Sequence, residues 1–164
     1  MSAKVVVVGS LNMDLVTRAS RLPRGGETLI GQSFATVCGG KGANQAVAAA
    51  RLGAQVSMVG CVGTDAYGQV LRQALLDEGI DCRAVSAVEG TSGVALIVVD
   101  DNSQNAIVIV AGANGALTPA VLGCFDAVLQ EADVIICQLE MPDATVGHAL
   151  KRGRELGKVV ILNP

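Results

Sequence analysis

The first element of the chain begins with Lys4-Val5-Val6-Val7-Val8-Gly9, a run of β-branched residues that a glycine closes. Such a short apolar run is typical of a central strand that is buried on both faces of a sheet. Outward from it, apolar runs alternate with helical patterns that begin at Asp or Thr-Pro and end at glycine. The expected strands are residues 55–62, 133–139 and 158–162, and the expected helices are residues 42–52, 65–78, 143–156 and one that opens at 118. This alternation predicts an α/β fold with a mostly parallel sheet and helices on both faces.

Two segments, residues 12–37 and 91–111, do not follow this alternation. The first contains two expected strands, 15–18 and 28–37, on either side of the turn-rich Leu22-Pro23-Arg24-Gly25-Gly26. The second contains strands at 92–100 and 105–110, which the polar residues 101–104 join into a hairpin. We expect both segments to form a small β-sheet that covers one edge of the main sheet, within one domain.

The composition excludes several classes of function. The chain has 164 residues, of which 51% are hydrophobic and 2% aromatic, and its formal net charge is -3. It has no run of Lys and Arg and few aromatic rings on which bases could stack, so nucleic-acid binding is not expected. The acidic balance gives no attraction to an anionic membrane. The apolar run in residues 1–8 is too short for a signal peptide or a membrane span.

The cysteines and the sole histidine suggest no metal site or catalytic group. The five cysteines are odd in number and include no CxxC pair, so we expect neither a disulfide framework nor a zinc site. Each is interpreted as a small buried hydrophobic residue, and a reduced, cytoplasmic location is predicted. His148 lies in an expected helix beside Lys151 and Arg152, which favours a solvated helix face.

The most distinctive local pattern is Gly39-Gly40-Lys41-Gly42-Ala43-Asn44-Gln45-Ala46. Its glycines let the backbone approach a ligand closely, and the helix that follows offers unpaired N–H groups at its first turn. Lys41 adds donors, and Asn44 lies about one turn into the helix. The spacing is that of neither a Walker A loop nor G-x-G-x-x-G. Taken alone, the pattern fits a loop that holds hydroxyls or a phosphate as well as a purely structural turn.

Polar residues follow two of the expected strands. Asn12 and Asp14 come directly after the first strand, and Glu140 follows the strand at 133–139. Ligands of open α/β sheets bind beyond the carboxyl ends of the strands, and a carboxylate beside an amide suits sugar hydroxyls. The alternatives are an Asx turn or helix cap at 12–14 and a solvated strand end at Glu140.

Together these patterns resemble the ribokinase-like carbohydrate kinases. The resemblance covers essentially the whole chain, and its most specific part is the glycine-rich pattern at 39–46. The other matching segments, in the same order, are Asn12-x-Asp14, Gly60-Cys61-Val62-Gly63-x-Asp65-x-x-Gly68, Ser92-Gly93-Val94-Ala95-Leu96-Ile97, Ala111-Gly112-Ala113-Asn114 and Leu162-Asn163-Pro164.

The resemblance implies an α/β sandwich whose small sheet is a lid over a sugar. It implies transfer of the ATP γ-phosphoryl group to a sugar hydroxyl, O5 in the case of ribose, with Mg²⁺ and a monovalent cation such as K⁺. A homodimer that forms through the lid is also implied. Ala95 and Ile97 would face the sugar from the lid, and the remaining contacts would come from Asn12, Asp14, Gly39, Gly40, Lys41, Asn44 and Glu140.

The family's Gly-Ala-Gly-Asp motif, which supplies the catalytic base, does not occur in this sequence. Gly112-Ala113-Asn114-Gly115 is a different element at a different place. We therefore expect the chain to be the amino-terminal, sugar-binding part of a longer kinase. No catalytic residue and no metal ligand is assigned to it, and the base and the nucleotide pocket are expected beyond Pro164. The part on its own is expected to be inactive.

Two alternatives remain at this stage. Within the family, the chain belongs to another sugar or nucleoside kinase, although Phe34, Tyr67 and Phe125 do not adjoin the motifs as a nucleoside base would require. Outside enzymes, it is a non-catalytic sugar-binding or regulatory module.

Overall fold

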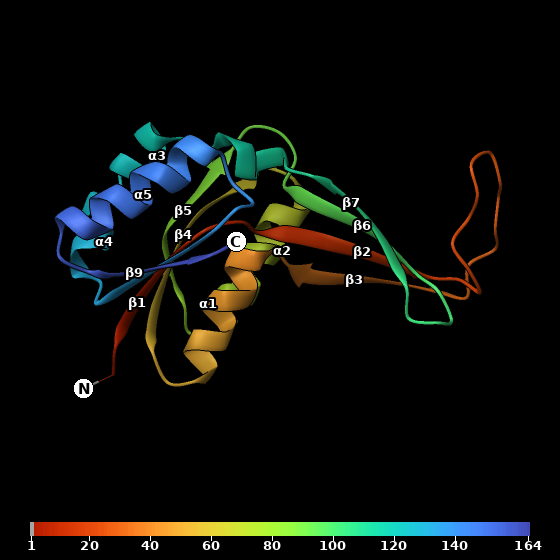
Figure 1. The fold of residues 1–164 in the computed structure, drawn as a ribbon, viewed down its shortest axis with the longest axis horizontal. Helices are drawn as coiled ribbons and strands as arrows, with labels where there is room; N and C mark the ends of the chain where they lie inside the picture. Colours follow the sequence, from red (N-terminus) through yellow and green to blue (C-terminus); the bar gives the residue numbers. More distant parts are fainter. Residues whose placement is uncertain (1) are drawn as a thin grey trace.

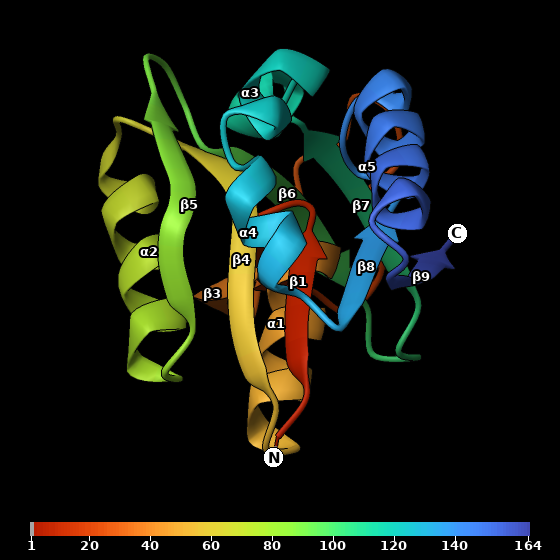
Figure 2. The ribbon, with the colours of Figure 1, turned by 90° about the vertical axis from the view of Figure 1, so that its left-hand side faces the viewer.

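The main sheet is fully parallel. A computed structural model describes residues 2–164, and its first sheet has the strand order β5-β4-β1-β8-β9 (Figures 1 and 2). Each neighbouring pair runs parallel, and β1 lies at the centre. The strands are β1 (Lys4–Val8), β4 (Gln55–Gly63), β5 (Asp81–Val88), β8 (Val134–Gln138) and β9 (Val159–Asn163). The expected valine-rich central strand is confirmed.

Helices cover both faces of this sheet, as predicted (Figure 2). One face carries α1 (Lys41–Arg51) and α2 (Ala66–Asp77), whose Ala46, Leu71 and Leu75 belong to the same buried cluster as Val5 and Val7 of β1. The opposite face packs on Val6 and Val8 and carries α3 (Pro119–Gly123), α4 (Asp126–Glu131) and α5 (Asp143–Glu155). Because successive side chains of a strand point to opposite faces, β1 supplies both cores at once.

The four remaining strands form a separate sheet, which we call the lid sheet. It consists of β2 (Asn12–Arg18), β3 (Ser33–Gly39), β6 (Gly93–Val99) and β7 (Asn105–Val110), in the order β3-β2-β6-β7. The pair β2–β6 is parallel and the other two pairs are antiparallel. The lid sheet projects to one side of the sandwich, and a loop at 19–32 extends from its far end (Figure 1). A short 3-10 helix, η1 (Gly112–Ala116), leads from β7 back to the sandwich.

Several expected boundaries were wrong. The strand expected at 28–37 begins at Ser33, because 28–32 belong to the loop, and the strand expected at 15–18 begins at Asn12. The helix expected from 118 is two short helices, α3 and α4, which Cys124 and Phe125 separate. β5 was missed altogether: it is the last strand of the sheet, only partly buried, and its mixed composition lacks a continuous apolar run.

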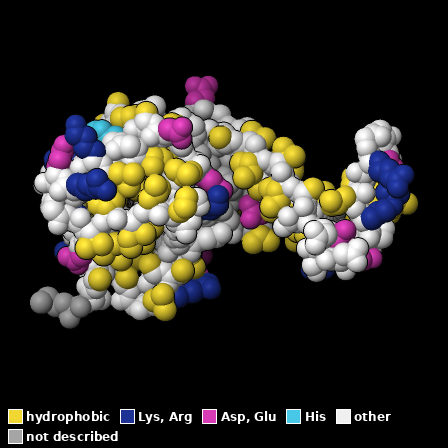
Figure 3. Space-filling view, in the orientation of Figure 1, with side chains coloured by type: hydrophobic (Ala, Val, Ile, Leu, Met, Phe, Trp, Pro, Cys, Tyr) yellow, Lys and Arg dark blue, Asp and Glu magenta, His cyan; other side chains and the backbone are white. Residues whose placement is uncertain are grey.

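The surface of the lid sheet is apolar for an exposed element. Apolar side chains gather along β6 and β7 on the side shown in Figure 3, and Val108 is 62% exposed. Basic side chains gather on the outer side of the 19–32 loop (Figure 3). Within residues 2–164, no helix combines the length and the apolar character that crossing a membrane requires.

Candidate functional site

Asn12, Asp14, Lys41 and Glu140 lie where the main sheet meets the root of the lid sheet. We call these four residues the polar cluster. Only three residues separate β1 from Asn12, the first residue of β2, and Glu140 follows β8 by two residues. Lys41 begins α1, directly after the glycine turn. Because β1 and β8 are neighbouring parallel strands, their carboxyl ends bring these residues to the same edge of the sheet.

The Glu140 carboxylate is held from three sides. Its Oε2 accepts hydrogen bonds from Ser10 Oγ at 2.7 Å and from the Lys41 backbone N–H at 3.2 Å. Its Oε1 lies 3.3 Å from Lys41 Nζ. Burial raises the pKa of Glu140, but the hydrogen bonds from Ser10 and Lys41 outweigh it and leave the pKa below its usual value. Glu140 is therefore an ionised, oriented acceptor at the first turn of α1.

Asp14 is the second carboxylate of the polar cluster, and fewer neighbouring groups stabilise its negative charge than that of Glu140. It pairs with Val37 of β3 and with Ala95 of β6 across the lid sheet. Burial, and then the negative charge of Glu140, raise the pKa of Asp14 above its usual value. Among the described residues, no group donates a hydrogen bond that would lower this pKa. The carboxylate lies over Gly39, where an added Cβ would overlap with it.

The glycine turn is needed for its shape as well as its backbone donors. Gly40 has a φ of 94°, in the left-handed region that favours glycine. A Cβ there would lie 2.8 Å from the backbone N of Asn12 and from the carbonyl oxygen of Ser10. Gly40 precedes α1 and has no side chain to cap it, and the N–H groups of Lys41 and Gly42 donate instead to Glu140 Oε2 and Ser10 Oγ. The structural and functional interpretations of this turn are therefore compatible.

The lid sheet provides an apolar face beside Asp14. Ala95 stands opposite Asp14 in the register, and Ile97 stands opposite Val16. Alternation along the strands places Asp14, Ala95 and Ile97 on the same face of the lid sheet. A cleft of about 440 Å³ adjoins the cluster, and its lining includes Asn12, Ile109, Asn114, Leu139, Glu140 and Met141.

Asn44 lies in the first turn of α1, three residues after Lys41. It is exposed on α1 and lines a groove between α1 and α2, together with Val37 and Cys38 of β3. The other predicted residues lie around the edge where β1, β8 and the lid sheet meet. Contact of any of them with a sugar remains a prediction.

Three buried polar residues of this region were missed by the sequence reasoning. Ser10 orients Glu140, and Asn114 binds the backbone of Leu11 and the side chain of Asn12. Gln138 donates to Gln45 of α1 at 2.6 Å. Asn114 lies inside a quoted motif and Ser10 directly follows the first strand and its glycine, but no spacing in the sequence links them to partners more than a hundred residues away.

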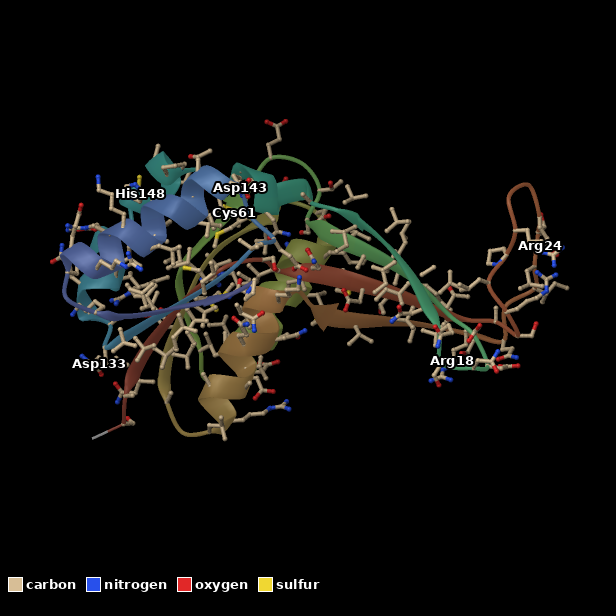
Figure 4. All side chains as sticks on the ribbon, viewed as in Figure 1. Arg18, Arg24, Cys61, Asp133, Asp143 and His148 are labelled. Atoms are coloured by element: carbon tan, nitrogen blue, oxygen red, sulfur yellow. The ribbon has the colours of Figure 1, made fainter. Side chains whose placement is uncertain are left out.

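The remaining reactive side chains lie elsewhere. His148 is exposed on α5, far from the lid sheet (Figure 4). All five cysteines are free; Cys61, Cys82 and Cys137 are buried as expected, whereas Cys38 and Cys124 are exposed and correct that expectation. Burial raises the pKa of Cys61 to about 11 and that of Cys137 to about 12, which makes these thiols unreactive. In the described part of the chain, no three His, Cys, Asp or Glu side chains group as metal ligands would.

Comparison with known proteins places this geometry in context. A family model described as pfkB family carbohydrate kinase matches residues 2–164. The ribokinase of Bacillus subtilis is 45% identical over 162 residues, which cover 98% of this chain and 55% of that protein. The deoxyribokinase of Salmonella typhi is 42% identical over 161 residues, which cover 98% of this chain and 53% of that protein. The chain spans about half the length of the curated relatives it matches.

A solved structure of the same fold carries ligands. The ribokinase of Arabidopsis thaliana, complexed with ribose and ATP, superposes with a TM-score of 0.88 at 35% identity. The superposition covers 99% of this chain and 53% of that one. Both layers of the sandwich and the lid sheet described above are therefore those of a known kinase fold.

Proposed function

The chain belongs to the pfkB family of carbohydrate kinases, and from this premise we propose that it is the sugar-binding part of a ribokinase, an ATP-dependent enzyme that phosphorylates D-ribose at O5. The sequence identity to the Bacillus subtilis ribokinase supports ribose as the substrate. So does the likeness to the Arabidopsis enzyme with its bound ribose and ATP.

The observation that carries the proposal is the pair of carboxylates at the root of the lid sheet. Glu140 is fixed by Ser10 and Lys41, whereas Asp14 keeps its acceptor oxygens open beside the apolar Ala95. Open carboxylate oxygens beside an apolar face suit a polyol, whose hydroxyls donate and whose carbons need cover. The proposed sugar contacts are Asn12, Asp14, Gly39, Gly40, Lys41, Asn44, Ala95, Ile97 and Glu140.

The residues described here do not fit the remaining cofactors of such a reaction. Residues 2–164 offer no cluster of three metal-ligating side chains for Mg²⁺, and the sequence contains no Walker A loop. We assign ATP, Mg²⁺ and a monovalent cation such as K⁺ to the complete enzyme. No residue of this chain is assigned a step in phosphoryl transfer.

Replacement of Asp14 tests the proposal. Each hydrogen bond from a hydroxyl to a charged acceptor contributes roughly 1.5–3 kcal/mol. Asp14→Ala should therefore weaken ribose binding at least about tenfold, measured by titration calorimetry. Asp101→Ala is the matched control, because Asp101 is exposed in the turn between β6 and β7. Unchanged ribose affinity in Asp14→Ala would remove Asp14 from the site.

Deoxyribose is the second candidate substrate, because the Salmonella typhi deoxyribokinase is almost as similar to the chain as the Bacillus subtilis ribokinase. Parallel titrations with ribose, deoxyribose, fructose and adenosine separate the candidates. Adenosine is disfavoured because the described cleft has no aromatic lining. Preference for any ligand over ribose would redirect the assignment within the family.

A further inference from the structure

The side chain of Asn114 has an orientation that the backbone dictates. It is 2% exposed, its Oδ1 accepts from the Leu11 backbone N–H at 2.9 Å, and its Nδ2 donates to the Leu11 carbonyl oxygen at 3.1 Å. A backbone N–H can only donate and a backbone carbonyl can only accept. The oxygen and the nitrogen of the Asn114 amide are therefore assigned without ambiguity.

Asn114 in turn fixes the amide of Asn12. The Asn114 Nδ2 also donates to Asn12 Oδ1, at 2.8 Å. Because an amide nitrogen has no acceptor capacity, Asn12 must turn its oxygen toward Asn114. The Asn12 nitrogen is left to face the other way, and Asn12 lines the cleft together with Glu140 and Ile109. Among buried side-chain polar atoms of the described residues, only Gln138 Oε1 lacks a partner, so the Asn12 nitrogen is not sealed in the core.

Gly93 provides the space for this arrangement. It pairs with Asn12 across the β2–β6 ladder, and β2 and β6 lie side by side at the root of the lid sheet (Figure 1). A Cβ on Gly93 would overlap with both Asn12 Oδ1 and Asn114 Nδ2. Any other residue at 93 would therefore push apart the hydrogen bond between the two amides.

We propose that Asn114 and Gly93 are positioning residues that hold Asn12 as a hydrogen-bond donor toward the sugar, an inference that rests on the proposed function. The site then contains both acceptors and donors of hydrogen bonds for the sugar hydroxyls. Asp14 and Glu140 accept hydrogen bonds, whereas Asn12 Nδ2 donates to the oxygen of a hydroxyl. The hydroxyl that faces Asn12 is recognised as an acceptor, and those that face the carboxylates are recognised as donors.

Nuclear magnetic resonance of the side-chain amides tests the arrangement without a sugar. Both N–H groups of Asn114 are bonded and buried, so we expect them to exchange with solvent at least about a hundredfold more slowly than those of Asn12. Saturating ribose should slow the exchange of the Asn12 amide. Equal exchange of the two amides in the free protein would overturn the proposed orientation, whether or not ribose binds.

Sugars with one hydroxyl replaced by fluorine test whether Asn12 acts as a donor toward the sugar, because fluorine cannot donate a hydrogen bond. One monofluoro ribose should bind within about threefold of ribose, and the others should lose at least about tenfold in affinity. Asn114→Asp replaces the donor nitrogen by an oxygen, so the Asn12 amide turns its own nitrogen toward position 114. The tolerated fluoro sugar should then bind at least about tenfold more weakly than ribose.

Gly93→Ala provides a second variant in case Asn114→Asp unfolds the chain. It should weaken ribose binding about tenfold, whereas Gly147→Ala, which adds a methyl group to open space on α5, should not. Melting curves confirm that each variant is folded. Ribose binding by the wild type together with wild-type affinity in folded Gly93→Ala and Asn114→Asp overturns the positioning role. No ribose binding by the wild type instead refutes the proposed function and leaves the exchange measurement to decide the inference.

Discussion

Asp14 and Glu140 are two carboxylates of the same cluster whose pKa values shift in opposite directions. Burial and the neighbouring charge raise the pKa of Asp14, whereas hydrogen bonds from Ser10 and Lys41 overcome burial and lower that of Glu140. Asp14 therefore favours folding below its unfolded pKa of 3.8, and this contribution is lost as the pH rises through the raised pKa. Glu140 contributes above its unfolded pKa of 4.5, and this contribution is lost as the pH falls through the lowered pKa.

Amide substitutions should show this difference in sign. Asp14→Asn should raise the free energy of unfolding at pH 7, by up to about 1 kcal/mol because Asp14 is partly exposed, and should give no gain near pH 3. Glu140→Gln should lower it at pH 7. Urea denaturation at the two pH values measures both. Loss of stability at pH 7 in Asp14→Asn would show that its charge is compensated in the folded chain.

The candidate site could be predicted in part from single residues. Asn12, Asp14 and Glu140 follow buried strands, and parallel strands bring their carboxyl ends to one edge. The residues that hold these side chains in place, Ser10 and Asn114, could not be predicted. Ser10 donates to Glu140, which is 130 residues away in the sequence, and Asn114 accepts from Leu11, which is 103 residues away. Such pairings depend on packing that no local pattern encodes. Asn44 was assigned by its motif, and it lines a groove with Val37, the residue that pairs with Asp14 across the lid sheet.

Helix α2 and the root of β6 are joined by a single residue. Asp65 caps α2 by accepting from the Gly68 backbone N–H at 2.9 Å. Its carboxylate also accepts from the hydroxyl of Ser92 at 2.6 Å and from the Ser92 backbone N–H at 2.9 Å. Burial raises the pKa of Asp65, but these hydrogen bonds outweigh it and lower the pKa overall. The cap predicted from sequence is therefore also the anchor of the lid sheet.

Removal of the Asp65 side chain should destabilise the folded chain. Asp65→Ala should lower the free energy of unfolding at pH 7 by about 2 kcal/mol, from the lost cap and the unpaired N–H of buried Ser92. Asp143→Ala is the control, since Asp143 begins α5 without a side-chain cap and should change stability by at most about 0.5 kcal/mol. Chemical denaturation compares the two variants. Equal losses would show that Asp65 acts only as a charge near a helix terminus.

The predictability of the elements follows the strength of their local sequence signals. β1 and β4 were predicted because strands buried on both faces need unbroken apolar runs, and α2 because Asp65 and Gly79 mark its limits. β5 was missed because its mixed composition lacks a continuous apolar run, whereas β3 was expected as a strand but with its start at 28 in place of Ser33. The order of strands in the lid sheet could not be derived, since parallel pairing of β2 with β6 joins segments that are far apart in the chain.

The whole molecule leaves a large apolar surface uncovered on the lid sheet. All residues of β7 are exposed, and Phe34 and Leu96 of neighbouring strands are 64% and 47% exposed. Patches of this kind mark interaction sites, so we predict a homodimer that forms through the lid sheets. Sedimentation should give twice the monomer mass of 16.6 kDa. Val108→Asp should yield the monomer, whereas Leu52→Asp, at the exposed carboxyl end of α1, should not. A monomeric wild type would contradict this prediction.

The isolated chain should lack kinase activity. Its described residues hold the proposed sugar contacts but no metal cluster, and its sequence has no Gly-Ala-Gly-Asp motif. Loss of a general base alone lowers a rate by about 10²–10⁴-fold. A coupled ADP-release assay with ribose, ATP and Mg²⁺ should therefore give no ribose-dependent signal, with a full-length ribokinase as the positive control. Turnover near the rate of that control would place the catalytic machinery within this chain.

The short connection from β1 to β2 has a mechanical consequence. Gly9, Ser10 and Leu11 are the only residues between β1 and β2, so Asn12 lies at the root of the lid sheet. The seven residues of β2 extend about 23 Å, and a rotation of about 5° at the root displaces the far end by about 2 Å. Arg24 lies beyond that end (Figure 4), so a spin label there measures small rotations of the lid sheet as amplified displacements.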